Sequence, residues 1–283
     1  MSSLTTLAVG SSWHQWVHKV FCVAVLFFLV APVLVVIPLS FNAEPYFTFT
    51  EGMLRLEPDA WSLRWYTSVL EEGRWLPALG RSLAIGITAT LLSTTLGTLA
   101  ALGLNSTAMP GRSLVMAVLI SPMVTPIIIT AAGMSFFYSA LGLGQTFTAL
   151  VLAHAVLGAP FVLIAVSASL SGYNQDLNRA ATNLGANAWT TWYRVQLPLI
   201  APGVLTGALF AFAASFDEVV IVLFIGGPEQ RTIPREMWAG IREQISPEIL
   251  AVATFLIVFA MLLLLAVNWL RQQEHTEASS EHR

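Results

Sequence analysis

The chain has 283 residues and a formal net charge of -3; 56% of the residues are hydrophobic and only 10% are charged. Soluble domains carry about 25% charged residues, so the composition excludes an ordinary soluble globular protein, and no basic patch favours nucleic-acid binding. Lys19 is the only lysine. A phosphate-binding loop of the G-x-x-x-x-G-K-S/T type needs a lysine after its glycines, so any ATP used must be bound by another subunit.

Six apolar segments are long enough to cross a membrane as helices, which takes about 20 residues each. They cover residues 20–40, 82–104, 114–140, 146–170, 199–225 and 249–270. A closed barrel is the other structure that spans a bilayer, but its strands are short and alternate in polarity. The sequence therefore predicts an all-α membrane protein, with six transmembrane helices in a domain over residues 20–270.

The two ends of the chain are predicted to lie outside the membrane, as a segment over 1–19 and a charged, disordered tail over 271–283. The first apolar segment exceeds the roughly 7–15 residues of a secretory signal, so we expect it to be retained. An even number of spans places both termini on one side. The positive-inside rule does not decide which side, because the arginines are divided almost evenly between the two sets of loops.

The longest connection covers residues 41–81, and its aromatic residues predict amphipathic pieces at the outer membrane interface. These residues are Trp61, Trp65, Tyr66 and Trp75. Pro122 and Pro126 fall inside the third segment and predict a kink, either static or part of a translocation path. His154, in the fourth segment, is expected to be a hydrogen-bonded packing residue rather than a ligand.

The connection over residues 171–198 is polar and long enough for two short helices. The letters LNRAATNL predict the first helix, Gly185 interrupts it, and NAWTTWYRV predicts the second, with Asn187 as its N-cap. The stretch QLPLIAP is expected to end the second helix before the next span, because proline cannot continue a helix interior. A hairpin of this kind is suited to docking into a groove of a soluble partner, although an ordinary amphipathic connector is the alternative.

The same loop resembles the EAA motif of bacterial ABC importer permeases, E-A-A-x3-G-x9-I-x-L-P. The matching positions are Ala180, Ala181, Gly185, Leu197 and Pro198. Val195 replaces the isoleucine, and Arg179 stands where that family usually has glutamate. The resemblance implies that this loop couples the membrane spans to an ATPase, with the family's carboxylate missing at position 179.

Four further stretches resemble permeases of the spermidine/putrescine importer family: PLSFN, RWYTSVL, SFDEVVIVLFIGGP and ISPEILAVATFLIV. The resemblance implies the MetI-like fold of ABC importer permeases, in a bacterial inner membrane with both termini and the EAA loop in the cytoplasm. It also implies three partners: a second permease subunit, an ABC ATPase dimer that binds ATP and Mg²⁺, and a periplasmic substrate-binding protein. No cofactor is expected in this chain itself.

Two adjacent acids, Asp217 and Glu218, interrupt the apolar run ASFDEVVIVLFIGG. An ionised acid at the bilayer centre costs about 2.5–3.5 kcal/mol on insertion scales, so something must compensate it. One interpretation is that one or both acids line the path of a cationic amine. The alternative is a structural role, in which the acids form an ion pair with Arg81 or Arg231 or a hydrogen bond to the partner permease.

We expect the fifth segment to be one continuous helix, in which neighbouring side chains point about 100° apart. The two acids would then face different surroundings. Glu218 would then continue a line of small residues that meets another helix or the partner subunit. That line contains Gly203, Gly207, Ala211 and Ala214. Phe212 and Phe216 are four residues apart and are interpreted either as a gate on the path or, more simply, as packing aromatics.

The sequence thus predicts the permease subunit of an ATP-driven ABC importer for putrescine or spermidine, and not an enzyme. Other amino compounds, such as 4-aminobutyrate or an aminophosphonate, are alternative substrates. A secondary transporter or channel driven by an ion gradient is a competing class, against which the docking loop and the missing inverted repeat both count. His14 and His18 have no third ligand nearby, so no metal site is expected.

Overall fold

The computed structural model describes residues 12–105, 109–243 and 246–262, and within these ranges the regular elements are all helices. The single extended pairing described is a bridge between Asn42 and Trp61. The chain divides into two compact units, one of Met1–Glu72 with Gly240–Arg283 and the other of Gly73–Ala239. The predicted all-α class is confirmed, and each unit is considered separately below.

The first unit contains the long apolar helix α1 (Ser12–Leu39) and the segment that follows it. Three short helices make up that segment: α2 (Glu51–Leu54), η1 (Pro58–Ala60) and α3 (Arg64–Glu71). The indole Nε1 of Trp65 donates to the carbonyl of Asn42 at 2.8 Å, which folds the segment back. The Oγ of Ser68 donates to Glu248 Oε1 at 2.5 Å, at the start of the helix Glu248–Leu262.

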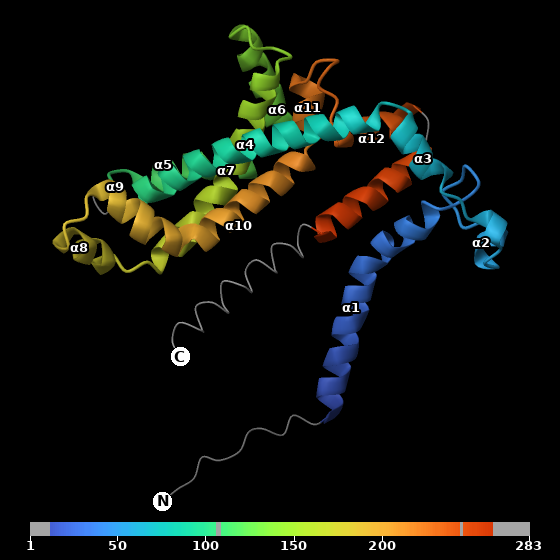
Figure 1. Ribbon diagram of the computed structural model, residues 1–283, viewed down its shortest axis with the longest axis horizontal. Helices are drawn as coiled ribbons and strands as arrows, with labels where there is room; N and C mark the ends of the chain where they lie inside the picture. The colour runs from blue at the N-terminus through green and yellow to red at the C-terminus, as the bar shows by residue number, and fades with distance from the viewer. Residues whose placement is uncertain (1–11, 106–108, 244–245, 263–283) are drawn as a thin grey trace, which may run out of the picture. The chain divides into compact units, whose positions relative to one another are not determined.

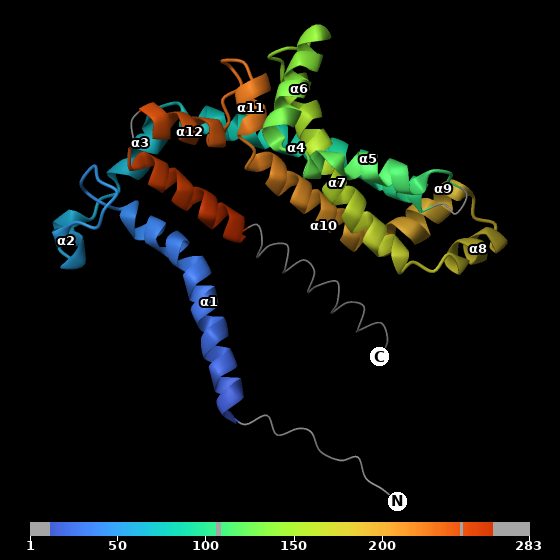
Figure 2. The same ribbon diagram turned by 180° about the vertical axis from the view of Figure 1, so that it is seen from behind.

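The second unit is built on three helices that run side by side, α4 (Trp75–Leu104), α7 (Phe147–Ser171) and α10 (Leu197–Phe216), as Figures 1 and 2 both show. Small residues allow their close approach. A Cβ added at Gly97 would lie 2.7 Å from Val162 Cβ, and one added at Gly207 would lie 2.6 Å from Val162 Cα. The predicted small-residue line of the fifth segment therefore meets another helix of the same chain, α7.

The start of α4 differs from the prediction. It begins at Trp75 rather than near residue 82, and Trp75 is 2% exposed instead of forming part of an interfacial loop. The guanidinium of Arg74 lies 4.9 Å from the centre of the Trp75 ring, so a cation–π contact accompanies this burial. The sequence suggested an interface residue because tryptophan has both an apolar ring and a polar N–H.

The third predicted span is two helices, α5 (Arg112–Val124) and α6 (Ile127–Ala140), bent by 104°. The break lies at Thr125, whose φ of -72° and ψ of 135° are extended. Residues that precede proline are pushed into this conformation, and Pro126 follows directly. The predicted kink is confirmed, and it is sharp enough that the pair can be a broken span or a re-entrant loop.

The fifth predicted span, residues 199–225, was wrong at both ends. Helix α10 stops at Phe216, and a separate helix α11 (Val220–Ile225) follows after a short break. Towards the N-terminus, α9 (Ala188–Thr191) and the π-helical turn η2 (Trp192–Gln196) run into α10, so that one helical rod covers Ala188–Phe216. Beyond α11 the chain forms α12 (Ile233–Glu243).

Within the described residues, four helices are long and apolar enough to cross a membrane, or five if α5 and α6 form one span. The sixth predicted span, residues 249–270, is described as far as Leu262 in the helix Glu248–Leu262. Its remaining residues, 263–270, lie outside the described ranges. The predicted end segments 1–19 and 271–283 likewise fall mainly or entirely outside them.

Candidate functional site

The polar loop forms the predicted helical hairpin. Leu184 is the C-cap of helix α8 (Asp176–Asn183), and Gly185 follows with a φ of +86°, a left-handed conformation that glycine adopts without strain. Asn187 then caps α9, because its Oδ1 accepts a hydrogen bond from the N–H of Thr190 at 2.8 Å. These local predictions are confirmed, and they place Gly185 at the tip of the hairpin.

The second arm of the hairpin does not end at Pro198, which corrects the sequence prediction. Pro198 lies in the first turn of α10, and the chain before it widens into the π-helical turn η2. The N–H of Leu197 donates to the carbonyl of Trp192, five residues earlier. A π-helical turn of this kind rearranges the hydrogen bonds near the position where Pro198 supplies no N–H. The helix therefore continues from the hairpin into the span.

The hairpin exposes several side chains that sequence reasoning did not single out. Leu184 is 89% exposed and Trp189 is 70% exposed. The rings of Trp189 and Trp192 have centroids 5.0 Å apart. Arg179 is also exposed and donates to Asp176 Oδ1 at 3.1 Å. Large apolar residues inside a polar loop are the sequence signal that could have identified this surface.

The two predicted acids lie at the break between α10 and α11. Asp217 is the C-cap of α10 and is exposed. Glu218 is half-buried, and its Oε1 accepts a hydrogen bond from the N–H of Ile221 at 3.0 Å, at the start of α11. The expectation that the acids occupy successive positions of one continuous helix was wrong. Glu218 is instead held at an interruption, where backbone groups are left without helical partners.

The arginines suggested as partners for these acids bind elsewhere. Arg81 pairs with Glu229 at 3.6 Å, and Arg231 pairs with the buried Glu236 at 3.2 Å. Across the part of the chain that the structure describes, no cationic side chain pairs with Asp217 or with its neighbour Glu218. The alternative of an ion pair with Arg81 or Arg231 is therefore not what this structure contains.

Phe212 and Phe216 form a stacked pair, with ring centroids 5.5 Å apart, in the last turns of α10. The ring of Phe212 also covers Gly86 of α4, where an added Cβ would lie 3.1 Å from the ring edge. Phe212 therefore packs between helices. Whether the pair also gates a path stays a prediction.

His154 of α7 is buried, at 1% exposure, and its Nδ1 lies 2.9 Å from the Oγ of Ser215 in α10. The expectation of a hydrogen-bonded packing residue is met by this contact. Sequence reasoning missed Ser215 as the partner. The only signal was a second polar residue in an apolar helix, two positions before Asp217.

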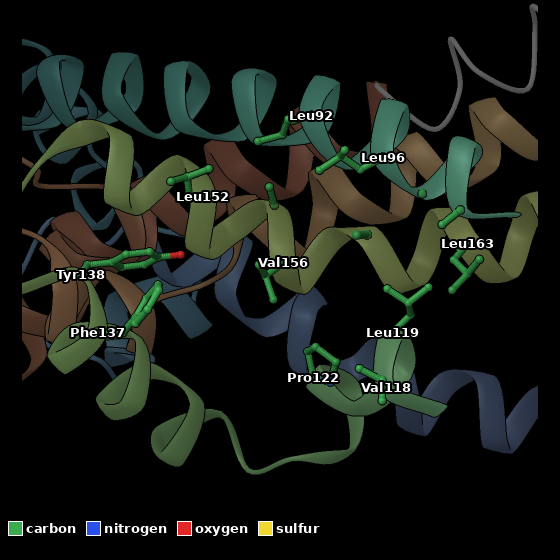
Figure 3. A pocket seen from close by; sticks show the side chains of 14 residues that line it. Leu92, Leu96, Val118, Leu119, Pro122, Phe137, Tyr138, Leu152, Val156 and Leu163 are labelled. Carbon is green, nitrogen blue, oxygen red and sulfur yellow. The ribbon is translucent and has the colours of Figure 1, made fainter. Parts of the chain in front are cut away.

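An apolar pocket of about 490 Å³ opens between α4, α7 and the bent pair α5–α6. Figure 3 shows Leu92 and Leu96 on one side, Pro122 and Val118 on another, and Tyr138 at one end. The Tyr138 hydroxyl is the only polar side-chain group among its lining residues. An ammonium group would lose its hydration there without a carboxylate in return, so this pocket does not suit a cation.

Small-residue helix packing, a polar hairpin continuous with a span, and acids at a helix break together favour a membrane permease over a simple anchor. A model of the family described as "Binding-protein-dependent transport system inner membrane component" matches residues 93–273. The chain belongs to this family and is the permease component of an ABC importer.

Several curated relatives match most of the chain. The spermidine/putrescine transport system permease protein PotC of Escherichia coli (strain K12) is 28% identical over 246 residues, which cover 87% of this chain and 90% of that one. The putrescine transport system permease protein PotI of the same strain is 30% identical over 237 residues, covering 81% and 82%. The molybdenum transport system permease protein ModB of Haemophilus influenzae is 31% identical over 216 residues, covering 70% and 94%.

A solved structure supports the fold. A chain of a bacterial ABC transporter involved in the import of the acidic polysaccharide alginate superposes with a TM-score of 0.67 at 15% identity, covering 96% of this chain and 99% of that one. At this identity the likeness concerns the fold alone. The predicted ABC permease fold is confirmed, and family membership places the chain in an inner-membrane transport system that works with a substrate-binding protein.

Proposed function

We propose that this chain forms the inner-membrane path of an ABC importer for putrescine, spermidine or a closely related cationic amine. The observation that carries the proposal is the pair of acids at the α10–α11 break. The carboxylate of Asp217 is exposed, and no cation of the described residues neutralises it. An intramembrane carboxylate of this kind is a binding group for a passing ammonium ion. Similarity to PotC and PotI, whose names state polyamine transport, supports the same substrate class.

The neighbouring aromatic pair fits the same ligand. Phe212 and Phe216 end α10 directly before Asp217. A cation that reaches the carboxylate can also be attracted by the face of an aromatic ring within about 6 Å. Acids beside aromatic rings would repel an oxyanion, which argues against a molybdate-type substrate despite the similarity to a molybdenum permease.

The hairpin is proposed to dock with an ABC ATPase that binds ATP and Mg²⁺. Its residues Arg179, Ala180, Ala181 and Gly185 lie in or directly after α8, while Leu197 and Pro198 lie where η2 joins α10. A second permease subunit and a periplasmic substrate-binding protein complete the proposed assembly. Both termini and the hairpin are proposed to face the cytoplasm.

Reconstitution tests this proposal. The chain, its partner permease, the ATPase and the binding protein are placed in liposomes, and ATP hydrolysis is measured while putrescine, spermidine, 4-aminobutyrate, an aminophosphonate or molybdate is added. Stimulation by a di- or polyamine is the expected result. Stimulation by 4-aminobutyrate or an aminophosphonate would shift the substrate to that amine. Stimulation by molybdate alone, or by none of the five in an intact complex, would contradict the polyamine assignment.

A further inference from the structure

The buried pair His154–Ser215 is a polar contact between two largely apolar helices, α7 and α10. Both side chains are enclosed, with 1% of His154 and 6% of Ser215 exposed. The Nδ1 of His154 takes part in the 2.9 Å hydrogen bond to Ser215 Oγ, whereas no group of the described residues hydrogen-bonds its Nε2. Most buried polar atoms in proteins are paired, and a half-satisfied imidazole between apolar helices calls for an explanation.

The position of Ser215 in α10 suggests an explanation for this buried hydrogen bond. It lies in the last turn of α10, which ends at Phe216, and the N–H of Asp217 makes a final helical hydrogen bond to Ala213 at 3.1 Å. One turn away, a Cβ added at Gly158 of α7 would lie 3.1 Å from Ala211 Cβ of α10. The hydrogen bond therefore joins the two helices next to their close approach and immediately before the break.

The other side of the break is held by a different helix. The Oγ of Ser135 in α6 donates to the carbonyl of Phe224 in α11 at 3.0 Å. Glu218 itself caps the start of α11 through the N–H of Ile221. The chain is thus tethered to α7 before Asp217 and to α6 after Glu218, so the direction of the two carboxylates depends on both tethers.

We infer that His154 is a positioning residue for the transport path, which acts through Ser215 to fix the orientation of Asp217 at the α10–α11 break. This inference rests on the proposed role of Asp217 in binding a cationic substrate. His154 itself does not contact the substrate. Loss of the hydrogen bond should let the last turn of α10 move while the Gly158–Ala211 contact keeps the helices packed.

The first measurement is independent of any substrate. Cys22 is the only cysteine, so Cys22→Ser gives a background in which Asp217→Cys introduces a single thiol at the break. Its rate of modification by a membrane-impermeant thiol reagent is measured in the assembled complex. Ser215→Ala and His154→Leu are each expected to change that rate about two- to tenfold, the effect of losing one hydrogen bond. His154→Asn, which keeps a hydrogen-bonding atom near the place of Nδ1, should restore most of it.

Ser93→Ala is the matched control. Ser93 is also a buried serine in an interhelical hydrogen bond, with its Oγ donating to the carbonyl of Ala155 at 3.1 Å, but this bond joins α4 to α7 and does not involve α10. Its removal should leave the thiol rate unchanged. An unchanged modification rate in Ser215→Ala, or an equal change in Ser93→Ala, would overturn the inference. If the His154→Leu variant does not assemble, the more conservative substitution Ser215→Ala decides the test.

The second measurement links the pair to substrate. With Asp217 present, Ser215→Ala should raise the amine concentration for half-maximal ATPase stimulation, and in an Asp217→Asn background it should add nothing further. Strictly additive effects would indicate a structural role alone. If no amine stimulates the intact wild-type complex, the proposed substrate fails, while the thiol rates still decide the role of His154.

Discussion

At the scale of single residues, the position of Asp217 has the most direct consequence. Its carboxylate is exposed at the end of α10 without a cationic partner among the described residues, as the proposed binding of a cationic substrate requires. Glu218 differs, because one of its oxygens already accepts the Ile221 N–H. The sequence left open which acid faces the path, and this hydrogen bond favours Asp217.

Asp217→Asn is therefore expected to raise the polyamine concentration for half-maximal uptake by about fivefold or more, because a charged hydrogen-bonding partner is lost. Assembly with the partner subunits should be unaffected. Asp59→Asn is the control, since Asp59 is an exposed acid in η1 and far from the break in sequence. Concentration-dependent uptake into liposomes is the measurement. Identical curves for wild type and Asp217→Asn would remove this residue from the path.

Gly185 carries a second prediction. Its φ of +86° is a conformation that a β-branched residue rarely adopts, with strain of about 1–3 kcal/mol. Gly185→Val should reduce the population of the docked hairpin, and hence substrate-coupled ATP hydrolysis, by about fivefold or more. Gly172→Val is the matched variant, because Gly172 at the other end of the loop has an ordinary φ of -91°. Equal coupling in the two variants would contradict the role of the hairpin tip.

At the scale of helices, stability depends on how closely α7 and α10 approach. A Cβ at Gly207 would come within 2.6 Å of a backbone atom, Val162 Cα, so the two helices would have to separate. Overpacking of this kind costs about 1–3 kcal/mol. Gly207→Ala should lower the melting temperature of the solubilised complex. Gly133→Ala in α6 is the control, because an added Cβ there meets nothing within 4 Å, and it should leave the melting temperature unchanged or slightly raised. A decrease in melting temperature as large as that of Gly207→Ala would contradict the packing argument.

The helices also show what can be predicted from sequence. The fourth segment was predicted over 146–170 and is found at Phe147–Ser171, because Thr146 caps its first turn and polar residues follow its last. Hydropathy could not locate the break after Phe216, since the residues on both sides of Asp217 and Glu218 are apolar. The bond that replaces helical pairing there comes from the Glu218 side chain, and its geometry depends on tertiary packing.

In the candidate site, the sequence predicted the features that depend on local residue preferences but not those that depend on tertiary contacts. Gly185 and Asn187 were found because left-handed turns and N-caps have local residue preferences. The continuation of α9 through η2 past Pro198 was missed, because the rule that proline ends helices does not anticipate a π-helical turn. The pairing of His154 with Ser215 joins residues 61 positions apart, and no local pattern specifies such a contact.

At the scale of the whole molecule, the orientation in the membrane is the testable property. In the Cys22→Ser background, Asp59→Cys introduces a thiol in the long connection after α1, and Arg283→Cys introduces one at the last residue. With both termini in the cytoplasm, an impermeant reagent added to intact spheroplasts should label only the first thiol. Disruption of the membrane, as the control, should expose the second. Labelling of the Arg283→Cys variant in intact spheroplasts would reverse the proposed orientation.

The rod formed by α9, η2 and α10 has a mechanical consequence. Its 29 residues from Ala188 to Phe216 contain no interruption, and at 1.5 Å per residue they extend about 43 Å. A movement of the hairpin beside Gly185 would therefore be carried by one continuous helical segment to its far end, where Asp217 lies. The first break in the helix along this path is the one at Asp217 and Glu218, between α10 and α11.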